Sequence, residues 1–284
     1  MIGRVDGTAG AADGVASWVG RSRESFDTFS PRLLEGYRAT VPLIWDGTAV
    51  PLGAFWCLSP DVFGADRLGD DGHPARGVVL PPVPFERRMW AGGELTFHGA
   101  FEPGDTVRKV STISDITEKS GRSGRLAFVT VEHAYHVGDR LVLSERQDIV
   151  YRDAQGSGPS RTPPPADPAP SDAVRREVAT DPVLLFRYSA LTFNGHRIHY
   201  DAPYAQNVEG YDGLVVHGPL QATVLLNLAA EVLGRVPTTF GYRGKSPLIC
   251  GAPFAVEVAP SSGGLSGRCL SAAGATTFSA AITG

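Results

Sequence analysis

The chain has 284 residues, of which 42% are hydrophobic and 20% charged, and its net charge at pH 7 is −4. That composition is typical of a globular protein, and the length predicts about two domains. The lack of a basic excess argues against a nucleic-acid partner, and no apolar run reaches the length of a membrane-spanning helix. The first twenty residues lack an apolar core flanked by positive charge, so we expect no secretory signal and a cytoplasmic location.

The three cysteines, Cys57, Cys250 and Cys269, are scattered and form no CxxC pair. This spacing predicts neither a disulfide framework nor a zinc-finger site. We therefore expect packed free thiols, as in a protein from a reducing compartment.

A segment rich in proline, serine and alanine interrupts the chain at residues 154–174. It holds almost no large apolar side chains, so it cannot bury enough surface to fold alone, and its prolines favour extended structure. We interpret it as a linker between an N-terminal lobe, residues 21–153, and a C-terminal lobe, residues 175–284. Residues 1–20 are assigned to an N-terminal extension.

The N-terminal lobe reads as helices followed by an antiparallel meander. A helix is expected around Glu24–Thr40, although Pro31 would remove a backbone donor from its middle. A second apolar helix is expected at Pro51–Cys57, and residues 61–88 read as a long loop. Strand patterns then follow at Thr106–Thr117, Leu126–His136 and Leu141–Tyr151.

The C-terminal lobe repeats this order. A mixed apolar segment at Leu184–Phe193 precedes the best helix of the chain, Pro219–Leu233, whose apolar residues recur every three or four positions and which Gly234 ends. Strand patterns follow at Thr238–Tyr242, Phe254–Ala259, Gly267–Leu270 and Thr276–Ile282. A helix followed by an antiparallel sheet, occurring twice, predicts an α+β fold with an internal structural repeat.

A polar cluster directly follows the segment at 184–193. Within eight residues it contains Asn194, His196, Arg197, His199 and Asp201. Histidine changes charge near neutral pH, so it is the usual general acid or base, and we take His199 as the base candidate. A turn would bring the carboxamide of Asn194 to the same point, where it could hold a water molecule.

Metal binding is the competing interpretation of this cluster. The HxxH pattern of His196 and His199 would need a third ligand, for which Asp201 and His217 are the nearby candidates. We favour a site without metal.

The start of the best helix is a second candidate feature, because Gly218 and Pro219 follow His217 there. Amides at a helix N-terminus are unpaired and carry partial positive charge, so they can bind a carbonyl oxygen that becomes anionic. Gly218 could instead be a plain cap residue. After a histidine–asparagine cluster, however, it completes a half-site of base, water and oxyanion donor.

Four stretches of the sequence carry a family resemblance. They are PFERRMWAGGELTFH (84–98), EKSGRSGRLAFVTVEH (118–133), FRYSALTFNGHRIHYDAPYA (186–205) and GLVVHGPLQATVLL (213–226). With them the chain resembles the MaoC-like hydratases and dehydratases of the hotdog superfamily. It is most similar to the two-lobed group of mesaconyl-C4-CoA (3-methylfumaryl-CoA) hydratases, and the fatty-acid-synthase-like and mitochondrial 3-hydroxyacyl-thioester dehydratases are also similar.

The resemblance implies a double hotdog, in which each lobe is a central helix wrapped by an antiparallel sheet and the sheets join side by side. The N-terminal lobe would be a degenerate hotdog that shapes the acyl and CoA tunnel, and the C-terminal lobe would be catalytic. The implied reaction is addition of water to, or its removal from, the α,β double bond of an acyl-CoA. We expect a short branched dicarboxylic substrate such as mesaconyl-C4-CoA or itaconyl-CoA, with coenzyme A as part of the substrate and no cofactor.

The resemblance also implies residue roles. The MaoC-type motif has an aspartate and, five positions later, a histidine, and these positions hold Asn194 and His199 here. Asparagine cannot accept a proton, so Asn194 would orient the water while His199 transfers protons. Gly218 would supply the oxyanion amide, and Asp201 is a candidate helper.

Several cations are candidates to bind CoA phosphates or a free substrate carboxylate, although solvated surface charge is the alternative for each. They are Arg87, Arg88, Lys119, Arg122 and Arg125, with Arg197 and His217 as further substrate-binding candidates near the motif.

Three other interpretations stay open. The chain could be a (3R)-hydroxyacyl-thioester dehydratase of fatty-acid or polyketide type, a hotdog thioesterase, or a non-catalytic acyl-thioester-binding partner subunit. A homodimer is also compatible with the sequence.

Overall fold

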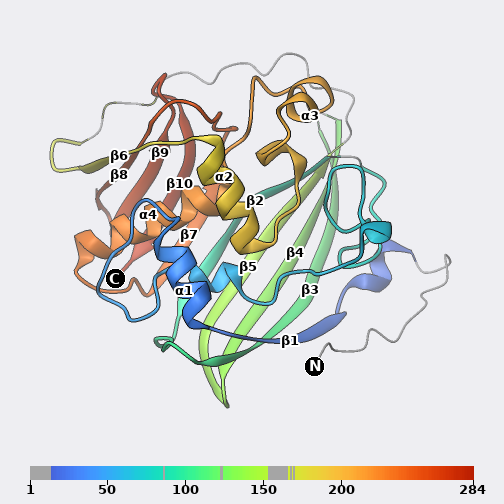
Figure 1. The fold of residues 1–284 in the computed structure, drawn as a ribbon, viewed down its shortest axis with the longest axis horizontal. Helices are drawn as coiled ribbons and strands as arrows, with labels where there is room; N and C mark the ends of the chain where they lie inside the picture. Colours follow the sequence, from blue (N-terminus) through green and yellow to red (C-terminus); the bar gives the residue numbers. More distant parts are fainter. Residues whose placement is uncertain (1–13, 86, 122–123, 153–165, 167, 169) are drawn as a thin grey trace.

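The computed structural model describes residues 14–85, 87–121, 124–152, 166, 168 and 170–284. Within this part of the chain, ten strands form a single sheet in the order β1-β3-β4-β5-β2-β7-β10-β9-β8-β6, with every neighbouring pair antiparallel (Figure 1). The first half of the chain supplies β1 (Ser22–Thr28), β2 (Arg87–Phe97), β3 (Thr106–Gly121), β4 (Gly124–Val137) and β5 (Arg140–Arg152). The second half supplies β6 (Val174–Val178), β7 (Thr239–Gly244), β8 (Phe254–Ser261), β9 (Gly264–Leu270) and β10 (Thr276–Thr283).

Four α-helices are described: α1 (Pro31–Arg38), α2 (Pro182–Thr192), α3 (Ala202–Asn207) and α4 (Gly218–Leu233). Short 3₁₀ helices lie at Val15–Trp18, Ala54–Cys57, Ala65–Arg67 and Arg197–His199. The combination of few helices and one large antiparallel sheet confirms the predicted α+β class. The predicted strand segments correspond to β3, β4, β5 and β7–β10.

Strand β2 joins the two halves. It pairs with β5 of the first half along most of its length, and with β7 of the second half through pairs such as Leu95 with Phe240. Sequence analysis missed it, because Gly92 and Gly93 interrupt its apolar pattern and glycine is depleted in strands. Those glycines lie where the strand bulges and where its neighbours approach most closely.

The helix expected at Pro219–Leu233 is confirmed as α4, which begins one residue earlier. Residues 220–230 are all buried, and the helix lies across the face formed by β7–β10 (Figure 1). Gly234 ends it in the left-handed region at a φ of 66°, which glycine adopts without a steric penalty.

The first helix was predicted wrongly. Residues expected to begin a helix at Glu24 form β1, which pairs with β3 at the sheet edge. The helix instead begins at Pro31, where a missing amide costs nothing, and the Ser30 side chain caps it by accepting a hydrogen bond from the Leu33 amide.

Two further segments differ in detail from expectation. Only Ala54–Cys57 of the second expected helix is helical, as a 3₁₀ turn, because Gly53 enters it with a φ of 88°. The mixed apolar segment at 184–193 forms α2, with Asp181 as its cap.

The two halves share a core around α4. The buried Asn227 side chain accepts a hydrogen bond from the Trp45 amide at 2.9 Å and donates one to the Leu52 carbonyl at 3.1 Å. The Tyr37 hydroxyl donates to the same carbonyl at 2.9 Å. The helix of the second half therefore fixes a loop of the first.

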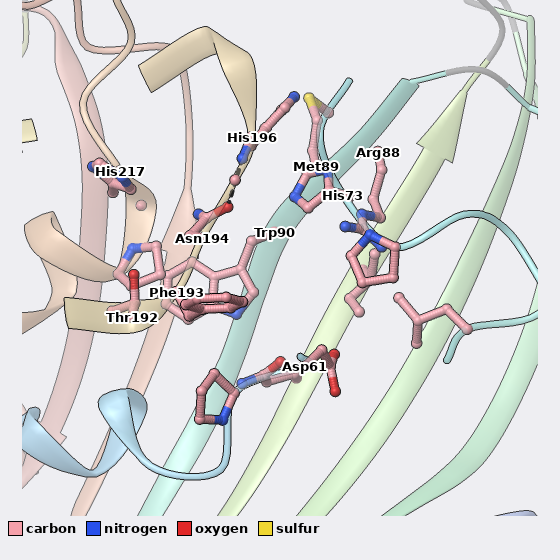
Figure 2. Close-up of a pocket in the computed structure, with 18 of the residues that line it drawn as sticks. Asp61, His73, Arg88, Met89, Trp90, Thr192, Phe193, Asn194, His196 and His217 are labelled. Carbon is pink, nitrogen blue, oxygen red and sulfur yellow. Dashed lines mark hydrogen bonds between the residues drawn. The ribbon is translucent and has the colours of Figure 1, made fainter. Parts of the chain in front are cut away.

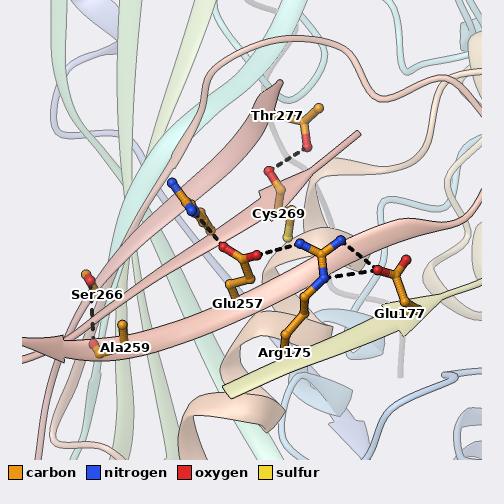
Figure 3. Close-up of polar contacts among 8 residues, drawn as sticks. Arg175, Glu177, Glu257, Ala259, Ser266, Cys269 and Thr277 are labelled. Atoms are coloured by element: carbon orange, nitrogen blue, oxygen red, sulfur yellow. Dashed lines mark hydrogen bonds and ion pairs between the residues drawn. The ribbon is translucent and has the colours of Figure 1, made fainter. Parts of the chain in front are cut away.

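The far edge of the sheet holds a buried carboxylate, Glu257 on β8 (Figure 3). Arg175 of β6 donates to it at 2.6 Å and Arg268 of β9 at 2.7 Å. A buried charge is tolerated only when paired, so these contacts tie three neighbouring strands together.

Two predicted segments, the N-terminal extension and the linker, lie largely outside the described residues. Of the N-terminal extension at 1–20, residues 14–20 are described, and Trp18 is buried against the outer core of β3, β4 and β5. Most of the linker at 154–174 lies outside the described residues. None of the described helices combines the length and apolar character needed to cross a bilayer.

A substitution at Gly93 tests the junction of the halves. A Cβ there would lie 2.0 Å from the Arg146 carbonyl oxygen and 2.5 Å from the Tyr242 hydroxyl. We expect Gly93→Ala to lower the free energy of unfolding by about 1–3 kcal/mol or more, because backbone must move. Gly241→Ala on the adjacent strand is the control, since its Cβ would meet nothing closer than 3.5 Å. Equal urea denaturation midpoints for the two variants would contradict this.

Candidate active site

A cavity of about 2880 Å³ runs along the face of the sheet and is lined by residues of both halves. It is larger than the roughly 300–1,000 Å³ of an ordinary small-molecule pocket, so it has room for a long ligand. Asn194 and His199 from the polar cluster, and Gly218 from the start of the best helix, all line it.

The turn after α2 sets the orientation of Asn194. Phe193 ends the helix in the left-handed region at a φ of 51°, and the Asn194 side-chain oxygen then accepts a hydrogen bond from the His196 amide at 3.0 Å (Figure 2). That bond identifies the oxygen and leaves the side-chain NH₂ as the outward group. Asn194 can therefore donate to a water molecule but has no spare strong acceptor on that side.

His199 is a buried imidazole with one defined tautomer. It lies in the 3₁₀ turn at Arg197–His199, and its Nδ1 is 2.7 Å from the Val215 carbonyl oxygen. A carbonyl only accepts, so Nδ1 carries the hydrogen and Nε2 keeps its lone pair. Burial lowers the pKa of His199 to about 4, against the opposing effect of the Val215 hydrogen bond. At neutral pH the ring is therefore an uncharged base.

His217 packs against His199. The two rings stack with centroids 3.6 Å apart and planes 19° apart, and His217 Nε2 bonds the Ser189 hydroxyl at 2.9 Å. Burial, and then the neighbouring His199, hold the pKa of His217 well below its usual range. Predicted as a substrate-binding residue, His217 lines the cavity but is 1% exposed, which suits it to positioning the His199 ring.

Gly218 is the first residue of α4, as the oxyanion assignment requires. A Cβ at this position would lie 2.8 Å from the Trp90 ring, so glycine permits the close packing of β2 against the helix start. Trp90 itself stacks on Tyr242 with centroids 4.5 Å apart.

The structure does not bring Asp201 into the site. Its carboxylate caps α3 by accepting from the Tyr204 amide at 3.1 Å and pairs with Arg197 at 2.7 Å. Neither Asp201 nor Arg197 lines the cavity. Arg197 also donates to the Asp70 carbonyl at 3.1 Å, so the pair connects the turn after α2 to the loop around Asp70.

The other predicted cations divide into two groups. Arg87 and Arg88 line the cavity, and Arg87 is ion-paired with Glu209 at 3.6 Å. Lys119 and Arg125 lie away from the lining residues, where Arg125 pairs with Glu118 at 3.0 Å. Arg122 lies outside the described residues.

Sequence analysis missed one residue of the site, His73, and Asp71, which contacts it; both lie in the segment read as a long loop. His73 lines the cavity, and its ring lies 4.2 Å from that of His196. The only local signal for them is the sequence Asp71-Gly72-His73 next to a turn. A single sequence does not show that His73 lies close to the polar cluster more than a hundred residues later.

These residues are also the ones best placed to hold a cation. The ligand atoms of Asp71, His73 and His196 lie within 4.8 Å of one another, whereas the ligands considered from the sequence, Asp201 and His217, are not part of the group. A carboxylate and two imidazoles suit a transition metal.

The arrangement can support acid–base chemistry with charge developing on an oxygen. A neutral imidazole lone pair, a carboxamide donor and a helix N-terminus line one cavity. The first can take a proton, the second can hold a water molecule, and the third can stabilise an oxyanion.

Known proteins similar to this chain are named for chemistry of the same kind. A family model described as hydroxyacyl-thioester dehydratase type 2 matches residues 53–250. A mesaconyl-C(4)-CoA hydratase of Chloroflexus aurantiacus is 41% identical over 279 residues, which cover 96% of this chain and 98% of that protein. A mitochondrial hydroxyacyl-thioester dehydratase type 2 of Schizosaccharomyces pombe is 26% identical, with 67% and 71% covered.

Solved structures show the fold. A MaoC-like dehydratase from Phytophthora capsici matches with a TM-score of 0.70 at 16% identity, covering 95% of this chain and 98% of that one. A Mycobacterium tuberculosis protein described as having a double hotdog fold matches with a TM-score of 0.52 at 18% identity, covering 95% and 97%. The predicted double hotdog is therefore confirmed, with the two sheets continuous through β2 and β7.

The charge state of His199 can be measured directly. Because burial lowers its pKa to about 4, we expect its ring resonances to show the neutral, Nδ1–H tautomer from pH 8 down to roughly pH 5. The measurement is a pH titration by ¹⁵N–¹H NMR of histidine-labelled protein, with His199→Gln to assign the signal. Protonation near the ordinary value of about 6.5 would contradict the buried, uncharged base.

Proposed function

This chain belongs to the hydroxyacyl-thioester dehydratase type 2 family, and we propose that it adds water to the α,β double bond of a short branched dicarboxylic enoyl-CoA, mesaconyl-C4-CoA first, or removes it again. The observation that carries the proposal is the buried His199, kept neutral and with its Nε2 lone pair free, in the same cavity as the donor amide of Asn194. Hydration of a conjugated thioester needs such a base and such a water site.

The proposed reaction begins with a water molecule held by the Asn194 NH₂ group. His199 Nε2 takes one proton as the water oxygen bonds to C3. The C2=C3 electron pair moves to the thioester, whose oxygen becomes an enolate. When the enolate collapses, His199 returns the proton to C2, so atoms and charge balance without a metal or redox cofactor.

The Gly218 amide supports the enolate in this proposal. It stands at the positive end of α4, where the first amides have no intrahelical acceptor. Removal of one such donor from an oxyanion hole typically costs about 10²–10³ in turnover.

Two observations favour a dicarboxylic acyl group. The relative at 41% identity, which the chain matches over nearly its whole length, is named a mesaconyl-C(4)-CoA hydratase. Arg88 is one of several cations, with Arg67, Arg152 and Lys245, that line the cavity without an ion pair to a carboxylate among the described residues, which suits an anionic ligand. Itaconyl-CoA is the second choice by the same argument.

Dehydration of a 3-hydroxyacyl thioester is the second candidate function. The family model and the yeast relative are both named for it, and by microscopic reversibility the same residues serve both directions. The first half of the chain would shape the acyl and CoA tunnel in either case.

Removal of the base is the central test. We expect His199→Ala to lower kcat for hydration by about 10²–10⁴, because its proton transfer is lost. The assay follows the absorbance of the conjugated thioester with mesaconyl-C4-, itaconyl-, crotonyl- and a long 2-enoyl-CoA. His98→Ala, an exposed histidine bonded to Ser144, is the matched control.

The panel separates the alternatives. Turnover of a dicarboxylic substrate that disappears in His199→Ala supports the proposal, and activity restricted to crotonyl- or long-chain CoA supports the dehydratase of fatty-acid type. Release of free thiol, followed with a thiol-trapping dye, would indicate a thioesterase. Near-normal turnover of His199→Ala would overturn the assignment of the base.

Asn194→Asp tests how the water is held. The variant keeps the oxygen that accepts from the His196 amide but exchanges the outward NH₂ donor for a second acceptor. We expect kcat at neutral pH to fall by about tenfold or more, as when one hydrogen bond of roughly 1.4 kcal/mol is lost. Turnover equal to or above that of the unmodified protein would show that position 194 acts as an acceptor.

A further inference from the structure

The first turn of α4 offers few backbone donors to the cavity. Pro219 has no amide hydrogen, and the Gln221 amide already donates to the His217 carbonyl oxygen at 3.2 Å. Leu220 is fully buried and does not line the cavity. Among the described residues of this turn, Gly218 is therefore the one whose amide can reach a ligand there.

A single donor is a sparse site for an oxyanion. An oxygen that becomes anionic has several lone pairs to satisfy, and oxyanion holes combine backbone amides with side-chain donors such as asparagine or glutamine. The reaction proposed for this site places an enolate oxygen at Gly218. We therefore looked for a second donor beside that amide.

Gln221 is the polar side chain that the helix places beside Gly218. The two residues are three positions apart, so they share one face of α4. Helical side chains lean toward the N-terminus, which carries the Gln221 carboxamide back over the first turn. Gln221 lines the cavity although only 3% of it is exposed.

Thr277 of β10 determines which end of this carboxamide is free. Thr277 Oγ1 lies 2.7 Å from Gln221 Oε1, and it lies 3.3 Å from the Cys269 carbonyl oxygen (Figure 3). A hydroxyl has one hydrogen, and 2.7 Å is the usual length of an O–H···O bond, so Gln221 Oε1 is the acceptor. The NH₂ group is then the free end, and no described residue accepts a hydrogen bond from it.

The other buried carboxamide of α4 is used entirely within the protein. Asn227 accepts a hydrogen bond from the Trp45 amide at 2.9 Å. Its NH₂ group donates to the carbonyl oxygens of Leu52 at 3.1 Å and Thr223 at 2.8 Å, and it does not line the cavity. Buried polar groups normally have partners, so the open donor end of Gln221 at the cavity wall points to an acceptor on a ligand.

We propose that Gln221 is a second oxyanion donor, whose side-chain NH₂ group and the Gly218 amide together bond the thioester oxygen as the enolate forms. This deepens the proposed function and rests on it for the reaction. Gln221 transfers no proton. It supplies the donor that Pro219 lacks, and because negative charge on the oxygen grows toward the transition state, it acts mainly on kcat.

Kinetics of Gln221→Met test the donor. Methionine is similar in length and has no N–H group, and Thr277 keeps the Cys269 carbonyl oxygen as an acceptor. We expect kcat for hydration of mesaconyl-C4-CoA to fall by about 10²–10³ with little change in KM, as for the loss of one oxyanion-hole donor. Gln221→Glu keeps the oxygen at Thr277 but presents an acceptor to the cavity. It should lose at least as much, which covers the case in which Gln221→Met does not fold.

An infrared measurement separates this role from a structural one. Methylsuccinyl-CoA is saturated and unreactive, and a ¹³C label in its thioester carbonyl makes that stretching band visible when it is bound to the full chain. We expect the bound frequency to lie below its value in buffer and to move part of the way back in Gln221→Met. Asn227→Ala, which alters the other buried carboxamide of α4, should lower the melting temperature and leave the frequency and kcat unchanged. His98→Ala should change none of the three.

Three outcomes overturn the proposal. They are near-normal kcat in both Gln221 variants, a loss that is confined to KM, and a carbonyl frequency that is the same in Gln221→Met as in the unmodified protein. A loss confined to KM would assign the NH₂ group to binding of the ligand in its ground state. The infrared arm needs no turnover, so it also separates the two proposals. A frequency that responds to Gln221→Met, without turnover of any enoyl-CoA on the panel, would refute the proposed reaction and still support the donor.

Discussion

The pairing of β2 with β5 on one side and β7 on the other is the constraint on which the molecule depends. It makes one sheet from two halves that are distant in sequence. The same strand carries Trp90 against the first turn of α4 and Arg88 into the cavity. A disturbance of its register would therefore move both the helix terminus and the cation relative to His199.

Burial governs the chemistry of the site. His196, His199 and His217 are buried and His73 is partly buried, and burial is the largest cause of the lowered pKa in each case. A neutral imidazole is the useful form for removing a proton from water. The Val215 carbonyl and the His217 ring complete the arrangement, because one sets the tautomer of His199 and the other its ring plane.

The two halves contribute differently to this site. Asn194, His199 and Gly218 come from the second half, whereas His73 and Arg88, which line the same cavity, come from the first. Contacts such as those of Asn227 with the Trp45 amide and the Leu52 carbonyl show that the halves also share a core. One cavity is therefore lined by residues of both halves of the double hotdog.

The sequence by itself determined the elements whose signals are local. The periodicity of α4, its terminal glycine, the alternating strands and the spacing of Asn194 and His199 were all readable. Two strands were not readable. Residues 22–28 form a strand because they pair with β3, and the two glycines of β2 hid its strand pattern. Only the tertiary structure decided that Asp201 braces Arg197 and that His73 reaches the cavity. Burial and the meeting of residues more than a hundred positions apart depend on sheet order, which no local pattern encodes.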